Sequence, residues 1–256
     1  MGRNPLDSAN KTAVILGAAS TVARSIAMEF ARGGYALVLA DCDHEETARI
    51  AADVALRFDV ACHAVPFDAT AYCTHRPFLE ECRRILGVEP QGVVLCFGYM
   101  PEQREAQEDF AKAQRAIDTN LTGAISVLEL FASAFEARRG GFIVGLSSVA
   151  GDRGRKANYI YGAAKAGLTC FLSGLRNRLH TAGVHVLTVK PGFMDTKMTY
   201  GMPLPGPLVA SPGQAARAIV RALRKGKDEV YVRFFWRYIM LIIRNIPEWQ
   251  FKKMNI

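Results

Sequence analysis

Short apolar runs alternate with longer amphipathic stretches along most of this chain. Runs of strand length occupy 12–16, 36–40, 60–65, 92–97, 141–146, 184–189 and 229–232. Apolar residues recur at helical spacing over 22–31, 44–58, 107–136, 159–180 and 210–224. This alternation predicts an α/β fold, a doubly wound parallel sheet in three α/β/α layers with helices on both faces.

The length of 256 residues is sufficient for one such domain with a full core. We expect an N-terminal tail at 1–10, a single domain at 11–232 and an amphipathic extension at 233–256. One segment, Gly201–Pro212, interrupts the alternation with four prolines. It follows the sixth predicted strand, at the edge of the sheet where open α/β folds bind ligands, and therefore predicts a substrate loop.

Positive charge is concentrated near the C-terminus. The formal net charge is +8, and 217–256 contain ten Lys and Arg against three Asp and Glu. A basic end indicates an anionic partner, namely membrane lipid, nucleic acid or an anionic substrate, or else a solvated helix face. We do not expect nucleic acid, because these basic residues are interleaved with a nearly continuous apolar surface rather than a polar groove.

The six cysteines and five histidines have neither CxxC pairs nor the spacing of metal ligands. With no secretory leader in the sequence, reduced thiols in a cytoplasmic protein are expected, and no metal site is predicted. No apolar run is long enough to predict a membrane-spanning helix.

The first chemical motif is the turn after the first strand, Gly17-Ala18-Ala19-Ser20-Thr21-Val22. A turn between a strand and a helix places backbone N–H groups and the helix dipole against a pyrophosphate, although an ordinary βα turn has the same pattern. Asp41 ends the second strand, where a carboxylate accepts hydrogen bonds from ribose hydroxyls and repels a 2′-phosphate. Asp41 therefore favours NAD without excluding NADP; the alternative role is a helix cap.

The second motif is Tyr161-Gly-Ala-Ala-Lys165, whose spacing puts a phenol and an ammonium on one helix face. We expect Lys165 to lower the pKa of Tyr161 from about 10 toward neutrality, which makes a phenol a usable general acid or base. Ser148 ends the strand before this helix, and Asn120 adds a polar group to a helix that is otherwise apolar.

Taken in order, the glycine turn, Asn120, Ser148 and Tyr161 with Lys165 resemble the short-chain dehydrogenase/reductase family of Rossmann-fold enzymes. The resemblance implies hydride transfer between a nicotinamide cofactor and a carbonyl or alcohol. Tyr161 would be the proton donor, Ser148 would hydrogen-bond the carbonyl oxygen, and Lys165 would hold the nicotinamide ribose. Asn120 would anchor a water in the proton relay.

The same resemblance implies a set of cofactor contacts spread over the turns at the strand ends. These are Gly17, Ser20, Thr21, Val22, Asp41, Asp68, Ala69, Gly98, Tyr161, Lys165, Pro191, Gly192 and Thr196. The chain departs from the family pattern at Thr21 and Ala23, which replace glycines, and at Leu95-Cys96-Phe97-Gly98, which replaces Asn-Asn-Ala-Gly. These departures leave open a dinucleotide-binding scaffold with little turnover.

Cys96-Phe97-Gly98, Leu146–Gly151 and the C-terminal extension resemble, more narrowly, the reductases that act on decaprenylphosphoryl-2-keto-ribose. That resemblance implies a lipid-linked sugar as substrate and peripheral contact with the inner face of the membrane. The arginines of Arg233–Arg244 fall on one helical stripe among apolar residues, which suits a helix lying in the membrane interface. Two alternatives stay open, namely a helix buried in a homo-oligomer and a soluble ketone or alcohol dehydrogenase.

Overall fold

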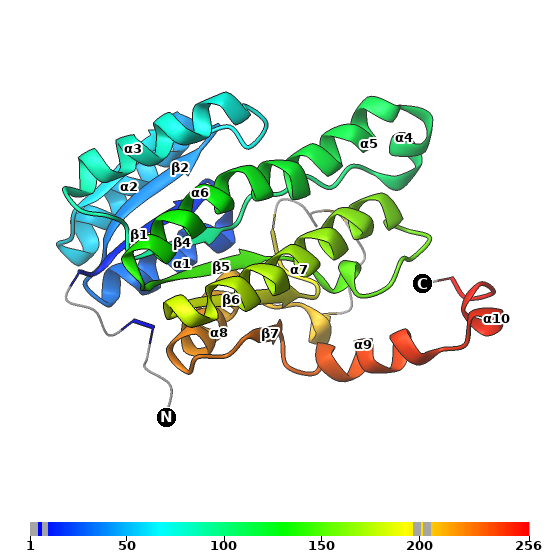
Figure 1. The fold of residues 1–256 in the computed structure, drawn as a ribbon. Helices are drawn as coiled ribbons and strands as arrows, with labels where there is room; N and C mark the ends of the chain where they lie inside the picture. The colour runs from blue at the N-terminus through cyan, green and yellow to red at the C-terminus, as the bar shows by residue number, and fades with distance from the viewer. Residues whose placement is uncertain (1–4, 7–9, 197–200, 202–205, 256) are drawn as a thin grey trace.

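The computed structural model describes residues 5–6, 10–196, 201 and 206–255. Its centre is a parallel sheet of seven strands in the order β3-β2-β1-β4-β5-β6-β7 (Figure 1). The strands are β1 (Thr12–Leu16), β2 (Ala36–Asp41), β3 (Cys62–Pro66), β4 (Gly92–Leu95), β5 (Gly141–Leu146), β6 (Val184–Pro191) and β7 (Glu229–Val232). Because β1 pairs with both β2 and β4, the strand order reverses there, and the carboxyl ends of these strands flank one crevice.

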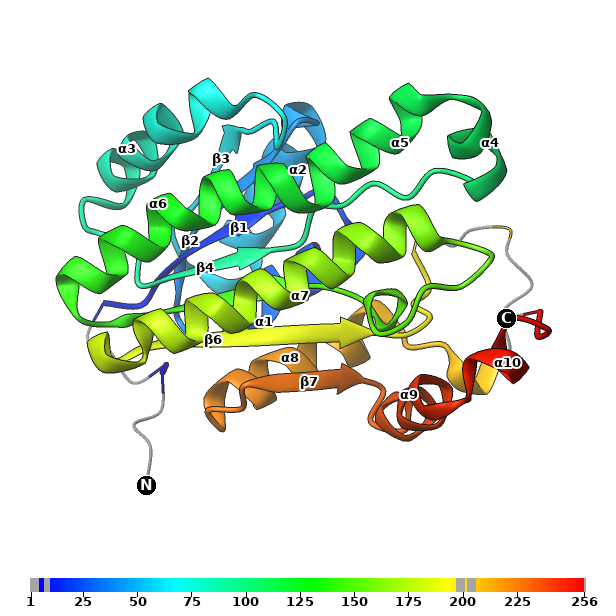
Figure 2. The same cartoon turned by 45° about the vertical axis from the view of Figure 1, so that its right-hand side comes forward.

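Two layers of helices cover the sheet, as Figure 2 shows. One layer comprises α1 (Thr21–Arg32), α2 (His44–Phe58) and α8 (Pro212–Arg224); the other comprises α3 (His75–Leu86), α6 (Gly123–Arg138) and α7 (Tyr159–Leu179). Strands β1 and β4 are buried at every position, because each face of the sheet packs against helices. The doubly wound, three-layer fold expected from the sequence is confirmed.

Helix α3 has no counterpart among the elements predicted from the sequence. It buries Phe78, Leu79 and Cys82 on one face, and its other positions are mostly charged. Pro77 lies in its first turn, where the missing N–H does not interrupt the helical hydrogen bonds. Its buried positions recur at helical spacing, so the sequence did carry a periodic signal for this helix, which our prediction did not use.

The single helix predicted over 107–136 is wrong, because the structure divides this region. It contains α4 (Gln103–Glu108), α5 (Phe110–Ile117), a π-helical turn at Asp118–Thr122 and then α6. Asp109 between α4 and α5 is extended, with φ −122° and ψ 101°. Apolar periodicity continues across both interruptions, and hydrophobic spacing alone therefore could not locate them.

The C-terminal extension forms α9 (Trp236–Asn245) and α10 (Glu248–Phe251). Trp236 and Met240 are buried against the domain. The guanidinium of Arg153 donates to the carbonyls of Ile243 (2.6 Å) and Ile246 (2.7 Å), which anchors the end of α9. The outward side carries exposed large apolar side chains, namely Phe234, Tyr238, Leu241, Ile242 and Trp249.

Within the described ranges, no helix combines the length and apolar character needed to cross a membrane. Of the substrate loop predicted at Gly201–Pro212, residues 202–205 lie outside the described residues; the described remainder contains a 3₁₀ turn at Gly206–Leu208 and the start of α8 at Pro212.

Candidate active site

The carboxyl edge of the sheet gathers the residues that the sequence singled out. Gly17 follows β1, Asp41 ends β2, Gly98 follows β4 and Ser148 follows β5, while Pro191 ends β6. Parallel strands bring these ends together at one edge. A cavity of about 360 Å³ opens there, between the loop after β4, the segment after β5, the start of α7 and the segment after β6.

Ser148 and Tyr161 face each other at this cavity. Ser148 begins a 3₁₀ turn at Val149–Gly151 and its hydroxyl accepts the Ala150 N–H at 3.1 Å. The Ser148 side chain also hydrogen-bonds the Tyr161 phenol. Gly162 permits this approach, since a β-carbon there would meet the Ala150 carbonyl oxygen at 2.8 Å. The glycine between Tyr161 and Lys165 therefore brings α7 close to Ser148.

The pKa of the Tyr161 phenol is raised to about 12 in this structure, first by burial, with the Ser148 hydrogen bond acting in the opposite direction. The Lys165 Nζ lies 5.7 Å from the centroid of the phenol ring and donates to the Leu146 carbonyl at 3.0 Å. Burial lowers the pKa of Lys165 to about 8. Our expectation that Lys165 brings the pKa of Tyr161 toward neutrality is wrong here, because burial of the phenol raises that pKa and the group that acts in the opposite direction is Ser148 rather than Lys165.

Asn120 lies in the π-helical turn and is 1% exposed. Its Nδ2 donates to the carbonyls of Tyr99 (2.6 Å) and Ala116 (2.8 Å), and its Oδ1 accepts the Tyr99 N–H at 3.2 Å. Both amide protons are thereby used, and Asn120 does not line the cavity. Its side chain fixes the loop after β4, which supplies part of the cavity wall.

The turn after β1 has the conformation that a pyrophosphate-binding turn needs. Gly17 has φ +79°, and a β-carbon on it would meet the Phe97 nitrogen at 2.3 Å. Ser20 caps α1 by accepting the Ala23 N–H at 3.2 Å. Thr21 and Val22 open the helix, and the Ala23 methyl is buried in the core rather than in the turn. Ala23, which replaces one of the glycines, therefore does not fill the space above the turn.

Asp41 is tied directly to this turn. Its Oδ2 accepts the Ala19 N–H and its Oδ1 accepts the Asp43 N–H, both at 3.1 Å. The cap of α2 is a different residue, Asp43, whose side chain accepts the Glu46 N–H. The alternative role of Asp41, as the cap of α2, is therefore wrong.

The remaining predicted contacts lie on either side of the crevice. Asp68 is exposed after β3 and its Oδ1 accepts both the N–H and the hydroxyl of Thr70 at 2.8 Å, which lowers its pKa. Ala69 is buried and Gly98 is half-buried. Pro191, Gly192 and Thr196 line the catalytic cavity itself.

The cavity residues that the sequence analysis missed include three with long polar or amide side chains, namely Gln103, Arg155 and Asn158. Each has a buried side-chain atom without a hydrogen-bond partner among the described residues: Gln103 Nε2, Arg155 Nε and Asn158 Oδ1. Arg155 and Asn158 stand between Ser148 and Tyr161 in the chain, and the polar character of that short segment was the signal that could have identified them.

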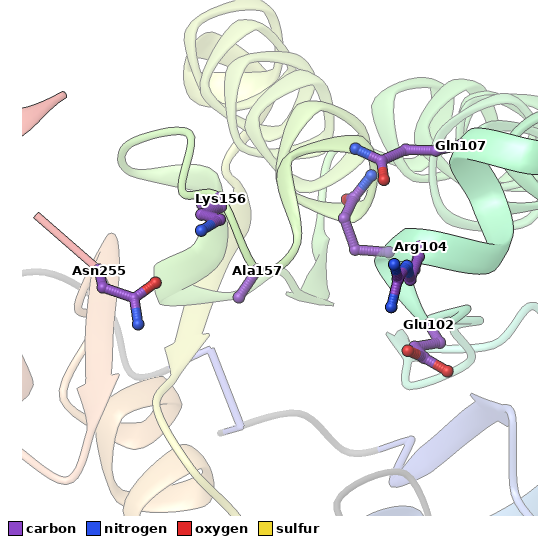
Figure 3. Close-up of a pocket in the computed structure, with 7 residues that line it drawn as sticks. Glu102, Arg104, Gln107, Lys156, Ala157 and Asn255 are labelled. Carbon is purple, nitrogen blue, oxygen red and sulfur yellow. The ribbon is translucent and has the colours of Figure 1, made fainter. Parts of the chain in front are cut away.

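A second, outer pocket of about 530 Å³ adjoins the catalytic cavity. Figure 3 shows Glu102, Arg104 and Gln107 on one side of it and Lys156 on the other, with Asn255 from the C-terminal end beyond Lys156. The two pockets share Glu102, Gln103 and Ala157 as lining residues.

The residues present fit a nicotinamide dinucleotide. The glycine turn leaves the start of α1 open, Asp41 stands at the end of β2, and the buried Lys165 ammonium has the Leu146 carbonyl as its hydrogen-bond acceptor. A buried ammonium can donate three hydrogen bonds, so hydroxyls of a ribose would satisfy the others. Among the described residues no cluster of His, Cys, Asp and Glu could hold a metal ion.

Comparison with known proteins gives matches over nearly the whole chain. The family model for short chain dehydrogenase matches residues 11–203. An uncharacterized oxidoreductase of Mycobacterium tuberculosis is 36% identical over 249 residues, covering 97% of this chain and 98% of that protein. An uncharacterized oxidoreductase of Streptomyces coelicolor is 32% identical, covering 96% of each chain.

Among solved structures, the short-chain dehydrogenase from Sphingobium yanoikuyae in complex with NADPH is similar in fold. Its TM-score is 0.79 at 22% identity, covering 93% of this chain and 96% of that one. At this identity the likeness shows the fold alone.

Proposed function

This chain belongs to the short chain dehydrogenase family and is an NAD(P)-dependent oxidoreductase, and on that premise we propose that it reduces the ketone of a sugar carried on a polyprenyl phosphate. The observation that carries the catalytic part of this proposal is that Ser148 and Tyr161 line one cavity, with the Lys165 Nζ 5.7 Å from the phenol ring. With its pKa raised to about 12 by burial, Tyr161 holds its proton at pH 7 and can donate it to a carbonyl oxygen.

The roles proposed for the protein's own side chains follow from their positions at the cavity. The ketone oxygen lies between the Ser148 hydroxyl and the Tyr161 phenol, which both donate to it as negative charge develops. A bound nicotinamide would supply the hydride to the carbonyl carbon. Tyr161 then transfers its proton to the oxygen, and the nearby Lys165 ammonium stabilises the phenolate that remains.

The cofactor is proposed to be NADH. Asp41 places a carboxylate beside the turn that would hold the pyrophosphate, where a 2′-phosphate would meet like charge. The structural neighbour from Sphingobium yanoikuyae is described with NADPH, which supports a nicotinamide cofactor of either kind.

The lipid-linked substrate is supported by the extension next to the cavity. Its outward apolar side chains include Phe234 and Ile242, which are 75% and 68% exposed. Arg237 and Arg244 are exposed on the same helix. A large exposed apolar patch with basic residues suits the interface of an anionic membrane. Trp236, on the inner side of the same helix, packs against Phe193 of the cavity wall.

The catalytic proposal is tested by ketone-dependent NADH oxidation, with purified polyprenyl-phosphate keto sugar as substrate. Tyr161→Phe removes the donated proton and should lower kcat by about 10²- to 10⁴-fold. Tyr72→Phe is the matched control, because Tyr72 lies in a 3₁₀ turn after β3, outside the cavity lining. Full activity of Tyr161→Phe would contradict the mechanism.

Membrane contact is tested by sedimentation with vesicles that contain about one-third anionic phospholipid. Leu241→Asp with Ile242→Asp should abolish binding, because both side chains are exposed on α9. Leu56→Asp is the control, since Leu56 is equally apolar and 87% exposed on α2. If the α9 variant instead loses its oligomeric mass in light scattering and keeps vesicle binding, the helix forms a homo-oligomer interface and the membrane proposal is wrong.

A further inference from the structure

Three buried polar atoms without partners lie at one cavity. They are the donors Gln103 Nε2 and Arg155 Nε and the acceptor Asn158 Oδ1. A buried polar atom left without a hydrogen bond costs about 1–3 kcal/mol, so such atoms usually bind water or a ligand. Since all three residues line the catalytic cavity, a polar ligand in that cavity would supply the missing partners.

The Arg155 guanidinium is also a charge without a counterion. Burial lowers its pKa, and Asp152 is the carboxylate that acts against that shift. The Asp152 carboxylate is already engaged, by Lys190 at 2.9 Å and by the Tyr231 hydroxyl at 2.8 Å. No described carboxylate forms an ion pair with Arg155. Arg155 is half-buried, with its Nε fully buried. Because a charge partly removed from water is costly without a counterion, the missing counterion indicates an anionic ligand.

The cations of the segment 153–156 differ in their partners. Arg153 is satisfied by the carbonyls of Ile243 and Ile246 and by the Glu248 carboxylate at 2.8 Å. Arg155 and Lys156, on the same short segment, face the two pockets instead. Within one run of chain, one cation therefore holds the fold together and two are available to a ligand.

The outer pocket continues the positive charge (Figure 3). Arg104 and Lys156 line it, and neither forms an ion pair with a carboxylate of the described residues. Glu102 contributes one negative charge to the outer pocket, whereas Arg104 and Lys156 contribute two positive charges. Arg155 adds a third positive charge from the adjoining cavity. The junction of the pockets, at Gln103, therefore lies in a net positive field.

We propose that Arg155, Lys156 and Arg104 bind the phosphate of a phosphorylated keto substrate at this junction, while its ketone lies beside Tyr161. This inference rests on the proposed ketone reduction and adds the residues that bind the phosphate of the substrate. A guanidinium suits this role because its N–H groups match phosphate oxygens in pairs, and a lysine adds a point charge.

The test is calorimetric titration of the full-length, NADH-saturated protein with inorganic phosphate, so that the cofactor's own phosphate site is filled. Arg155→Gln and Lys156→Gln should each weaken phosphate binding about tenfold or more, the effect of losing a charge-assisted hydrogen bond. Arg224→Gln, on the exposed face of α8, should leave it unchanged. Unchanged affinity in Arg155→Gln and Lys156→Gln, or no saturable binding to the unaltered protein, overturns the proposal.

A second measurement separates binding from folding. Removal of an unpaired buried charge should leave the Tm of Arg155→Gln equal to or above that of the unaltered protein. A clear fall in Tm would mean that Arg155 serves packing, and the proposal would be wrong. Tyr161→Phe should bind phosphate with unchanged affinity while losing ketone reduction. The phosphate site and the proposed ketone reduction can therefore fail independently.

The source of the phosphate is resolved by a parallel titration. Nanodiscs that contain undecaprenyl phosphate are compared with nanodiscs of neutral lipid alone. Binding to the former that is lost in Arg155→Gln identifies a lipid phosphate. Loss of inorganic phosphate binding in that variant, with no difference between the nanodiscs, identifies a soluble phosphate ester. Either result keeps the assignment of the site.

Discussion

Gly192 and Trp236 are in such close contact that a β-carbon on Gly192 would meet indole atoms at 2.0 Å. Gly192 follows β6 in the cavity wall, and Trp236 begins α9. The indole is 3% exposed, and its Nε1 donates to the Leu208 carbonyl at 3.3 Å. The absence of a side chain at Gly192 thus seats the extension directly against the catalytic edge.

Gly192→Ala should displace Trp236 and loosen α9. Overpacking of a filled site costs about 1–3 kcal/mol, measured as a lower free energy of unfolding in urea. Tryptophan emission should shift to longer wavelength as the indole meets water. Gly174→Ala is the matched control, because no atom lies within 4 Å of a β-carbon there and alanine favours its exposed helix. Equal stability of the two variants would contradict the contact.

Lys165→Met should stabilise the protein in a pH-dependent manner. Burial lowers the pKa of Lys165 from 10.5 to about 8. Below about pH 8 both folded and unfolded states bind the proton, and the folded state bears the whole cost of the buried charge. Between about 8 and 10.5 only the unfolded state binds it, so the stability of the unaltered protein rises with pH.

The advantage of Lys165→Met is therefore largest at neutral pH, at most about 3 kcal/mol, and disappears above about pH 10.5. Urea unfolding of both proteins at pH 7 and at pH 10.5 measures this difference. A constant difference across that range would mean that the Lys165 pKa is not lowered. Ketone reduction should be lost at every pH, because the variant lacks the ammonium beside Tyr161.

Asp41→Asn should narrow the preference between cofactors. The unaltered protein is expected to bind NADH more tightly than NADPH, since the Asp41 carboxylate repels a 2′-phosphate. Removal of that charge should lower the Kd for NADPH relative to the Kd for NADH about tenfold. Titration of nicotinamide fluorescence measures both values. Asp43→Asn is the control, because Asn keeps the cap of α2. Tighter binding of NADPH by the unaltered protein would refute the role of Asp41.

Asn120→Ala should affect stability as well as activity. It leaves the Tyr99 N–H and carbonyl without their side-chain partner, at a cost of about 1–3 kcal/mol. We expect kcat and the free energy of unfolding to fall together, because the loop after β4 loses its support. A loss of kcat with unchanged stability and an altered pH profile would instead favour the water-anchoring role inferred from resemblance.

Much of the fold could be predicted because buried parallel strands leave a distinct sequence record. β1, β4 and β5 are apolar runs bounded by polar segments, and α1 and α8 have apolar faces of helical period. The division at Asp109 and the π-helical turn could not be predicted, since apolar spacing continues through both.

The sequence by itself determined which chemical groups are available. These are the glycine turn after β1, the Asp41 carboxylate at the end of β2, Ser148 after β5, and Tyr161 with Lys165 on α7. Only the tertiary structure decided the direction in which the pKa of Tyr161 shifts, because desolvation depends on what surrounds the phenol. It also decided which side of α9 packs on the domain, and which cations of the segment after Ser148 stay unpaired. The residues that bury a side chain or pair with its charge belong to segments distant in the chain. The local spacing of residues therefore cannot predict them.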